Sequence, residues 1–463
     1  MQKIKNPDFT TGPLFVRIFM FAVPLILTGI LQLLYNAADN VVVGKFSGDP
    51  NALASVGCTS SLNNLIVTFL ISFSVGSSVV IAQNFGAKKD EAVSKAVHTS
   101  ISIALIGGII ISVLGFFLCE KALIMMGTNS DLLPKARLYT QIICIGIPAS
   151  AVYNFGATVF RAIGDSKTPL IILACTGIVN VVFNLIFVIV FNLSVAGVAI
   201  ATIISQYLSA FAVIFLLYRS SECYCFRFSK LGFDRAILEK MLIIGIPAGI
   251  QGILFSLSNV IIQSGVNTFP IEVISGNTIG ATVEGFTYIA MNSFSHATIT
   301  FAGQNFGAFK FKRVKKVLFY ALIQVTAVGL FVGNMEIIFA RQLSALFLDT
   351  TQENIPLVID AAAVRIKIIL GTYFLCGIME VLAGYLRALG KSFITMICSL
   401  TGACLLRIVW VKFIFVLPAF NSQTGLYVSY PITWLFTCLL LAAFAIATSI
   451  KHFRRYSGSN TEV

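Results

Sequence analysis

The chain is a succession of long apolar stretches separated by short polar breaks. Each stretch runs for about 20 residues or more without the two-residue alternation of a porin strand, so each predicts a helix that crosses a bilayer. We place twelve spans, at residues 14–43, 54–83, 95–118, 138–161, 168–191, 195–218, 240–268, 274–303, 316–340, 361–386, 393–417 and 426–450. The pattern predicts an all-α polytopic membrane protein with no separate soluble domain.

Composition and charge support this prediction. Of the 463 residues, 57% are hydrophobic and 11% charged, whereas soluble proteins carry about 25% charged residues. Most of the 32 Lys and Arg residues fall on one side of the membrane, in loops such as 219–240 and 310–316. By the positive-inside rule we expect both termini in the cytoplasm and the protein in the cell's inner, or plasma, membrane. The net charge of +13 then faces anionic membrane lipids and requires no nucleic-acid partner.

Other common signals are missing from the sequence. The segment Met1 to Pro13 lacks the features of a removable signal peptide. Most of the ten cysteines lie in apolar context, and Cys223 and Cys225 have no second pair or nearby histidine, so we expect no metal site and no resident cofactor. We expect His98 and His296 to be structural.

The two halves of the chain repeat each other. The segment Gln-Asn-Phe-Gly-Ala at 83–87 recurs at 304–308, and Arg-Ala-Ile-Gly-Asp-Ser at 161–166 recurs as Arg-Ala-Leu-Gly-Lys-Ser at 387–392. Pro24 recurs as Pro247. With six spans in each half, both halves enter the membrane in the same direction.

The repeat predicts two pseudo-symmetric six-helix bundles. We assign 1–218 to an N-lobe, 219–240 to a cytoplasmic linker and 241–463 to a C-lobe. Two such bundles leave a central cleft suited to alternating access. The major facilitator superfamily shares this plan, but its Gly-x-x-x-Asp-Arg loop signature is absent from residues 83–90.

At Pro24, Asp39, both Gln-Asn-Phe-Gly-Ala loops and residues 161–169, the sequence resembles the multidrug and toxic compound extrusion (MATE) family. The resemblance covers essentially the whole chain and is closer to the DinF-like and MepA-like bacterial branch than to the NorM branch. It implies a MATE-type fold of twelve helices. It also implies that Asp39, Tyr35, Asn154, Asn180, Asn184 and Thr202 form an N-lobe site for a proton or a cation.

Intramembrane carboxylates are the first candidates for chemistry, because a charged group at the bilayer centre costs about 2.5–3.5 kcal/mol. Asp39 ends a polar stripe of Gln32, Tyr35 and Asn36 at helical spacing, and Pro24 upstream permits a hinge. Such a stripe can hold a proton or a sodium ion, or it can simply hydrogen-bond helices together.

The second half carries Glu284, Glu336 and Glu380 within spans. Glu284, Tyr288, Met291 and Asn292 share a helical face suited to a flat aromatic cation; alternatively Glu284 is a protonated, hydrogen-bonded group. The predicted substrate cleft consists of Gln32, Asn36, Gln206, Glu284, Tyr288, Met291 and Glu380. We expect Glu336 to be structural, reaching the interface or pairing locally next to Arg341.

Two further positions bear on the C-lobe. Position 255 is Phe where the NorM pattern has an acid, with Gln251 the nearest polar residue, which argues against a sodium site there. Arg407 and Lys412 lie in the eleventh span and either pair with Glu380 or Glu284 or extend to an interface.

The primary hypothesis is a secondary active antiporter that exports small organic, cationic compounds in exchange for H⁺ or Na⁺, acting as a monomer. The alternative is a flippase or exporter for lipid-linked oligosaccharides or metabolites, which we rank lower because few basic residues lie inside spans. An enzyme is not expected, since neither a His-Glu-x-x-His helix nor a Ser-His-Asp grouping is present. A nucleotide-binding loop is absent too, and the two-lobed repeat argues against a channel.

Overall fold

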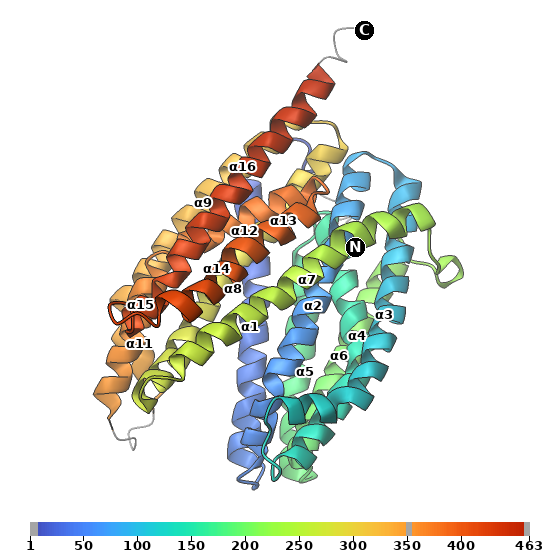
Figure 1. Cartoon of the computed structure of the whole chain (residues 1–463). Coiled ribbons are helices and arrows are strands. Elements are labelled where there is room, and N and C mark those ends of the chain that lie inside the picture. The colour runs from blue at the N-terminus through green and yellow to red at the C-terminus, as the bar shows by residue number, and fades with distance from the viewer. Residues whose placement is uncertain (1–7, 349–353, 458–463) are drawn as a thin grey trace. The chain divides into compact units, whose positions relative to one another are not determined.

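The computed structural model describes residues 8–348 and 354–457, and this part of the chain is helical with no strand (Figure 1). The long helices are α1 (Leu14–Phe46), α2 (Ala52–Gly86), α3 (Asp90–Met125), α4 (Leu133–Ala162), α5 (Lys167–Leu185), α6 (Ser194–Arg219), α7 (Arg235–Val266), α8 (Ile271–Gly307), α9 (Phe311–Ile338), α11 (Ile355–Leu370), α12 (Tyr373–Ala388) and α16 (Ser429–Ser457). The shorter elements are η1 (Ile186–Val190), η2 (Phe228–Lys230), α10 (Ala340–Ala345), α13 (Ser392–Ser399), η3 (Leu400–Leu405), α14 (Leu406–Val409), η4 (Trp410–Ile414) and α15 (Gln423–Tyr427). The predicted all-α class is confirmed.

Within the described residues, ten helical segments are long and apolar enough to cross a membrane. The tenth predicted span is the pair α11 and α12, which together make one further span bent by 44°. The eighth is α8, whose 37 residues are long enough to cross, although many are Gly, Ser, Thr or Asn. Ten helices and one bent pair therefore match eleven of the twelve predicted spans, and α8 lies at the position of the remaining one.

The eleventh span is not a regular α-helix. It begins as α13, passes through the π-helical segment η3, returns briefly to α14 and continues as the π-helical η4. A π segment leaves the i→i−4 hydrogen-bond ladder and rotates the side chains that follow it, and such segments are frequent at functional sites. Arg407 lies in α14, between the two π segments.

The sequence repeat produces two equivalent turns. After α2, Lys89 N–H donates to Asn84 O at 3.0 Å, and after α8, Lys310 N–H donates to Asn305 O at 2.9 Å. Both turns need a left-handed residue, which is Lys88 (φ 55°) in the first and Phe309 (φ 57°) in the second. The repeated motif therefore encodes a helix stop with the same backbone in each half.

The chain forms two compact units, and their boundaries cut through two helices. The first unit contains Pro24–Gly249, and the second contains Phe9–Val23 together with the described residues from Ile250 onward. The boundary in α1 falls at Pro24, and that in α7 falls just after Pro247. A proline inside a helix removes one backbone hydrogen bond and permits a bend, so these helices can belong to different packing groups on either side of it. The predicted lobes and linker remain a proposal.

Each unit is held together by close helix crossings. In the first unit, α4 packs against α2, α3 and α6, and α5 packs against α6. In the second, α8 packs against α9, α11 and α12, and α12 packs against α16. The crossing of α2 and α7 in the first unit depends on Gly76, because a Cβ there would overlap the backbone of Met241 and Gly245. Small residues that let backbones approach are the usual means of packing membrane helices.

We expect Gly76→Val to lower the free energy of unfolding by about 1–3 kcal/mol, because the added side chain must force α2 and α7 apart. The matched control is Gly57→Val on the same helix, where a Cβ would have no neighbouring atom within 4 Å. Equilibrium unfolding in mixed detergent micelles measures both. Equal effects of the two substitutions would contradict the close crossing.

Candidate functional site

Asp39 lies in α1 with neutral hydrogen-bond donors around its carboxylate. Asn184 Nδ2 on α5 donates to Oδ1 at 2.5 Å, and Thr202 Oγ1 on α6 lies 3.5 Å from Oδ2. Among the described residues, Asp39 has no Lys or Arg within 4 Å. The structure therefore brings together, from three helices, residues that sequence analysis had linked, and it leaves the negative charge without a cationic partner.

Two further oxygen atoms in this cluster can coordinate a cation. Thr202 Oγ1 has one proton, which it can donate to Val198 O at 2.9 Å or to Asp39 Oδ2 at 3.5 Å, and it keeps lone pairs for a ligand. Asn184 Oδ1 is buried and has no hydrogen-bond partner among the described residues. Asn180 completes the cluster by accepting from Asn184 Nδ2 at 3.3 Å and donating to Thr202 Oγ1 at 3.4 Å.

Glycine and aromatic residues position α1 against α5. The ring of Tyr35 occupies the space that a Cβ on Gly177 would need, and its hydroxyl lies 3.3 Å from the carbonyl oxygens of Leu173 and Ala174. Tyr139 on α4 interacts electrostatically with Asp39 and lies in an apolar cluster with Val42, Val43, Val188, Val195 and Val198. Sequence analysis missed Tyr139, since one tyrosine at the end of an apolar span carries no distinguishing signal.

The other candidates of the first unit do not join this cluster. Asn154 is buried and donates instead to Ser150 on its own helix, at 2.8 Å to the carbonyl oxygen. Gln206 packs against Gly146 on α4. Gln32 and Asn36 are exposed, along the stripe that leads to Asp39.

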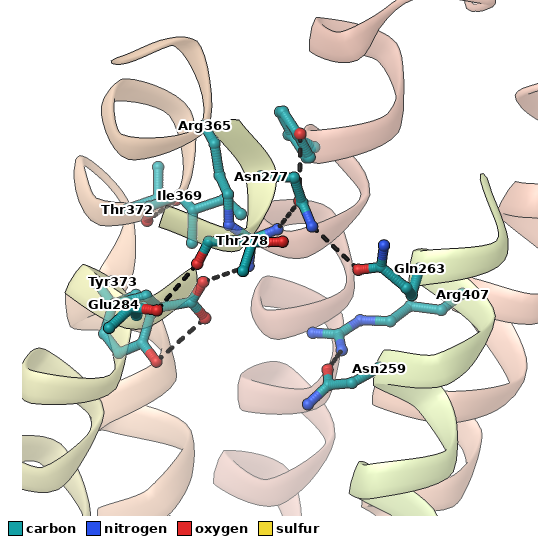
Figure 2. Close-up of polar contacts among 12 residues, drawn as sticks. Asn259, Gln263, Asn277, Thr278, Glu284, Arg365, Ile369, Thr372, Tyr373 and Arg407 are labelled. Carbon is teal, nitrogen blue, oxygen red and sulfur yellow. Dashed lines mark hydrogen bonds and ion pairs between the residues drawn. The ribbon is translucent and has the colours of Figure 1, made fainter. Parts of the chain in front are cut away.

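The second unit contains a buried ion pair (Figure 2). Arg365 Nη2 on α11 lies 2.5 Å from Glu284 Oε2 on α8, and the two side chains are only 6% and 16% exposed. Tyr373 donates to the other carboxylate oxygen at 3.3 Å. Glu284 is therefore paired with a cation, and the alternative of a lone protonated Glu284 is not supported. Sequence analysis missed Arg365, although its position inside the apolar stretch Ile355–Leu370 was a usable signal.

Amide side chains extend this pair into a network. Asn277 Oδ1 accepts from Arg365 Nη1 at 2.6 Å and from the Tyr427 hydroxyl at 3.2 Å. Asn277 Nδ2 donates to Gln263 Oε1 at 3.0 Å, and Gln263 Nε2 donates to Asn267 at 2.8 Å. Asn259, Gln263 and Asn267 lie one turn apart along the chain, a polar ladder that the sequence displays at i, i+4 and i+8.

The prediction for Arg407 is wrong, and Glu336 does not pair with its neighbour Arg341. Arg407 pairs with neither Glu380 nor Glu284, and at 3% exposure it does not extend to an interface. Lys412 is exposed. Arg341 pairs with Asp360 at 2.5 Å, whereas Glu336 accepts a hydrogen bond from Thr287 at 2.6 Å.

The predicted face of α8 is only partly open. Tyr288 is 41% exposed, and its hydroxyl accepts from Asn292 at 3.3 Å. Met291 is fully buried, with its sulfur near Gly329 and Gly377, which places it in the packing core of the unit. Glu380 is also buried, and its charge is attracted to Arg387.

Comparison with known proteins identifies related chains. The MatE family model matches twice, at residues 24–186 and 247–411. The chain is 27% identical to "Probable multidrug resistance protein YoeA" of Bacillus subtilis, over 91% of each protein. It is 22% identical to the "FAD transporter" of Shewanella oneidensis, over 88% of this chain and 89% of that protein. The structure of a multidrug resistance MATE transporter in an outward-facing conformation superposes with a TM-score of 0.88 at 18% identity, covering 97% of this chain and 99% of that one.

The buried pair predicts a large stability difference. We expect Glu284→Gln to lower the free energy of unfolding by about 3–5 kcal/mol, because it leaves Arg365 charged and buried without a counter-charge. Asp360→Asn, which breaks the exposed pair with Arg341, should cost about 0–1 kcal/mol. Equilibrium unfolding in mixed micelles compares them, and similar losses would show that Glu284 and Arg365 do not form a buried pair.

Proposed function

Because the chain belongs to the MatE family of multi-pass membrane transporters, we propose that it is a secondary active antiporter that exports small organic compounds in exchange for protons or sodium ions. Its family members are transporters and not enzymes. The observation that carries the proposed coupling is the Asp39 carboxylate, which lies between three helices with neutral partners only.

Such a carboxylate favours the binding of a positive ion. A charged group in a low-dielectric interior is costly unless it is neutralised, and H⁺ or Na⁺ supplies the missing charge. A sodium ion would take oxygen ligands from Asp39, Thr202 and Asn184, whereas a proton needs the carboxylate alone. Tyr35 holds α1 against α5, Asn180 links α5 to α6, and Asn154 lies outside this cluster.

Ion binding must differ between two states of the protein if it is to drive export. Asp39 lies in the same helix as Pro24, where α1 passes from one compact unit to the other. We infer that neutralising Asp39 changes the bend of α1 at Pro24 and thereby the affinity for substrate.

The proposed substrates are cationic or amphiphilic organic compounds. The exposed ring of Tyr288 and the half-buried amide of Asn292, both on α8, suit a flat cation. Export of a metabolite is the second candidate, which is supported by the similarity to a transporter named for FAD. We place the protein in the plasma membrane as a monomer, surrounded by lipid, with both termini in the cytoplasm.

We expect Asp39→Asn to abolish ethidium transport driven by an ion gradient in proteoliposomes. A pH gradient and a sodium gradient are imposed separately on wild type and variant, because the gradient that drives wild-type transport identifies the ion. Asp131→Asn, which changes an exposed acid in a loop, should transport like wild type. Transport unaffected by Asp39→Asn would remove Asp39 from the mechanism.

The variant Thr202→Val separates the two ions. It removes one oxygen ligand beside Asp39 while keeping the shape of the side chain. If sodium is the coupling ion, we expect about a tenfold higher sodium concentration for half-maximal transport, since one of few ligands is lost. If the proton is the coupling ion, the pH dependence of transport should stay close to wild type. Full loss of transport under both gradients would contradict a role limited to ion coordination.

A further inference from the structure

Arg407 is a buried charge without a counter-charge. Its side chain is 3% exposed, and among the described residues no carboxylate lies within 4 Å of it. Its hydrogen bonds go to neutral oxygens and are long: 3.3 Å to Thr433 and 3.4 Å to Ser258 and to Asn259. Arg365 in the same unit, by contrast, has a carboxylate at 2.5 Å.

The surroundings of Arg407 compensate its charge only in part. An arginine guanidinium keeps its charge inside proteins, and burying it without an anion is costly. The ring of Tyr430 lies 4.3 Å from the guanidinium carbon and offers a cation–π contact, which supplies no negative charge of its own. Glu284 is paired with Arg365, Glu336 accepts from Thr287, and the charge of Glu380 is attracted to Arg387.

The guanidinium of Arg407 also has N–H groups without an acceptor among the described residues, and it lies next to the exposed side chain of Asn259. Arg407 Nη2 makes no hydrogen bond to any described residue, whereas Nη1 reaches Asn259 on α7 (Figure 2). Asn259 is exposed, and its amide nitrogen donates to no described residue. The Asn259 amide therefore meets the guanidinium through its oxygen, and Arg407 Nη2 and Asn259 Nδ2 both remain donors.

We propose that Arg407 and Asn259 form an anion-binding subsite for a carboxylate or phosphate group of the transported compound. This proposal rests on the proposed transport function and refines its substrate class: compounds that carry an anionic group, including zwitterions, are preferred over purely cationic analogues. Arg407 lies in α14 between the π-helical segments η3 and η4, so the backbone on both sides of it departs from regular α-helix.

The test uses two dyes that differ in one charge, rhodamine B with its free carboxylate and rhodamine B ethyl ester. Their equilibrium affinities for the full-length protein are measured by fluorescence polarisation in nanodiscs of neutral phosphatidylcholine, with empty nanodiscs subtracted. We expect wild type to prefer the acid. Arg407→Gln should lower the acid-to-ester affinity ratio about tenfold, because one charge-assisted hydrogen bond is lost.

A second variant guards against misfolding of the first. Asn259→Asp places a carboxylate beside Arg407, which supplies the missing counter-charge and should support folding while excluding the anion. We expect it to lower the acid-to-ester ratio as Arg407→Gln does, and Arg341→Gln, which changes an exposed arginine, to leave the ratio unchanged. A ratio unchanged in both Arg407→Gln and Asn259→Asp would overturn the proposal.

The phosphate of a lipid headgroup is another anionic group that could bind to Arg407 and Asn259. Nanodiscs with added phosphatidylglycerol test it, and loss of the acid preference in them would assign the subsite to lipid and overturn a role in substrate choice. The binding assay needs no ion gradient. Failure of this proposal therefore leaves gradient-driven transport and its dependence on Asp39 intact, and failure of the antiport leaves the dye preference measurable.

Discussion

The free-energy cost of a charge in a low-dielectric interior is the constraint on which this structure depends. In the second unit this cost is offset by an ion pair, in which Glu284 and Arg365 lie 2.5 Å apart. Asn277 accepts a further hydrogen bond from the guanidinium of Arg365. Asp39 and Arg407, by contrast, have no ion-pair partner within 4 Å among the described residues. Both are surrounded by neutral hydrogen-bonding groups, and their opposite signs suit opposite partners: a positive ion at Asp39 and an anionic group at Arg407.

Breaks in regular helix geometry occur at the same places as the unusual charges. Pro24 interrupts the hydrogen-bond ladder of α1 about four turns before Asp39, and π segments lie on both sides of Arg407. A transporter needs helices that can adopt two shapes, and a missing backbone hydrogen bond lowers the free-energy difference between them. Pro247 in α7 likewise precedes a row of polar side chains, Asn259, Gln263 and Asn267.

The two proposed sites lie in separate units. In the proposed antiport, ion binding at Asp39 would concern the first unit and would set which gradient supplies the energy. Substrate recognition at Arg407 and Asn259 would concern the second unit and would set which compounds are chosen. Separate sites allow substrate range to change while ion coupling is kept, because substitutions at one site leave the contacts of the other in place.

The sequence by itself determined the helical class, the series of membrane-spanning helices and the internal repeat, because bilayer thickness and backbone hydrogen bonding leave few options for apolar segments of this length. The resemblance to the MATE family also indicated the cluster around Asp39, because it implied one site from Asp39, Asn180, Asn184 and Thr202. Only the tertiary structure decided the partners of the charges. Arg365 reaches Glu284 across 81 positions of the chain, and Arg407 reaches Asn259 across 148, and no local spacing encodes such contacts.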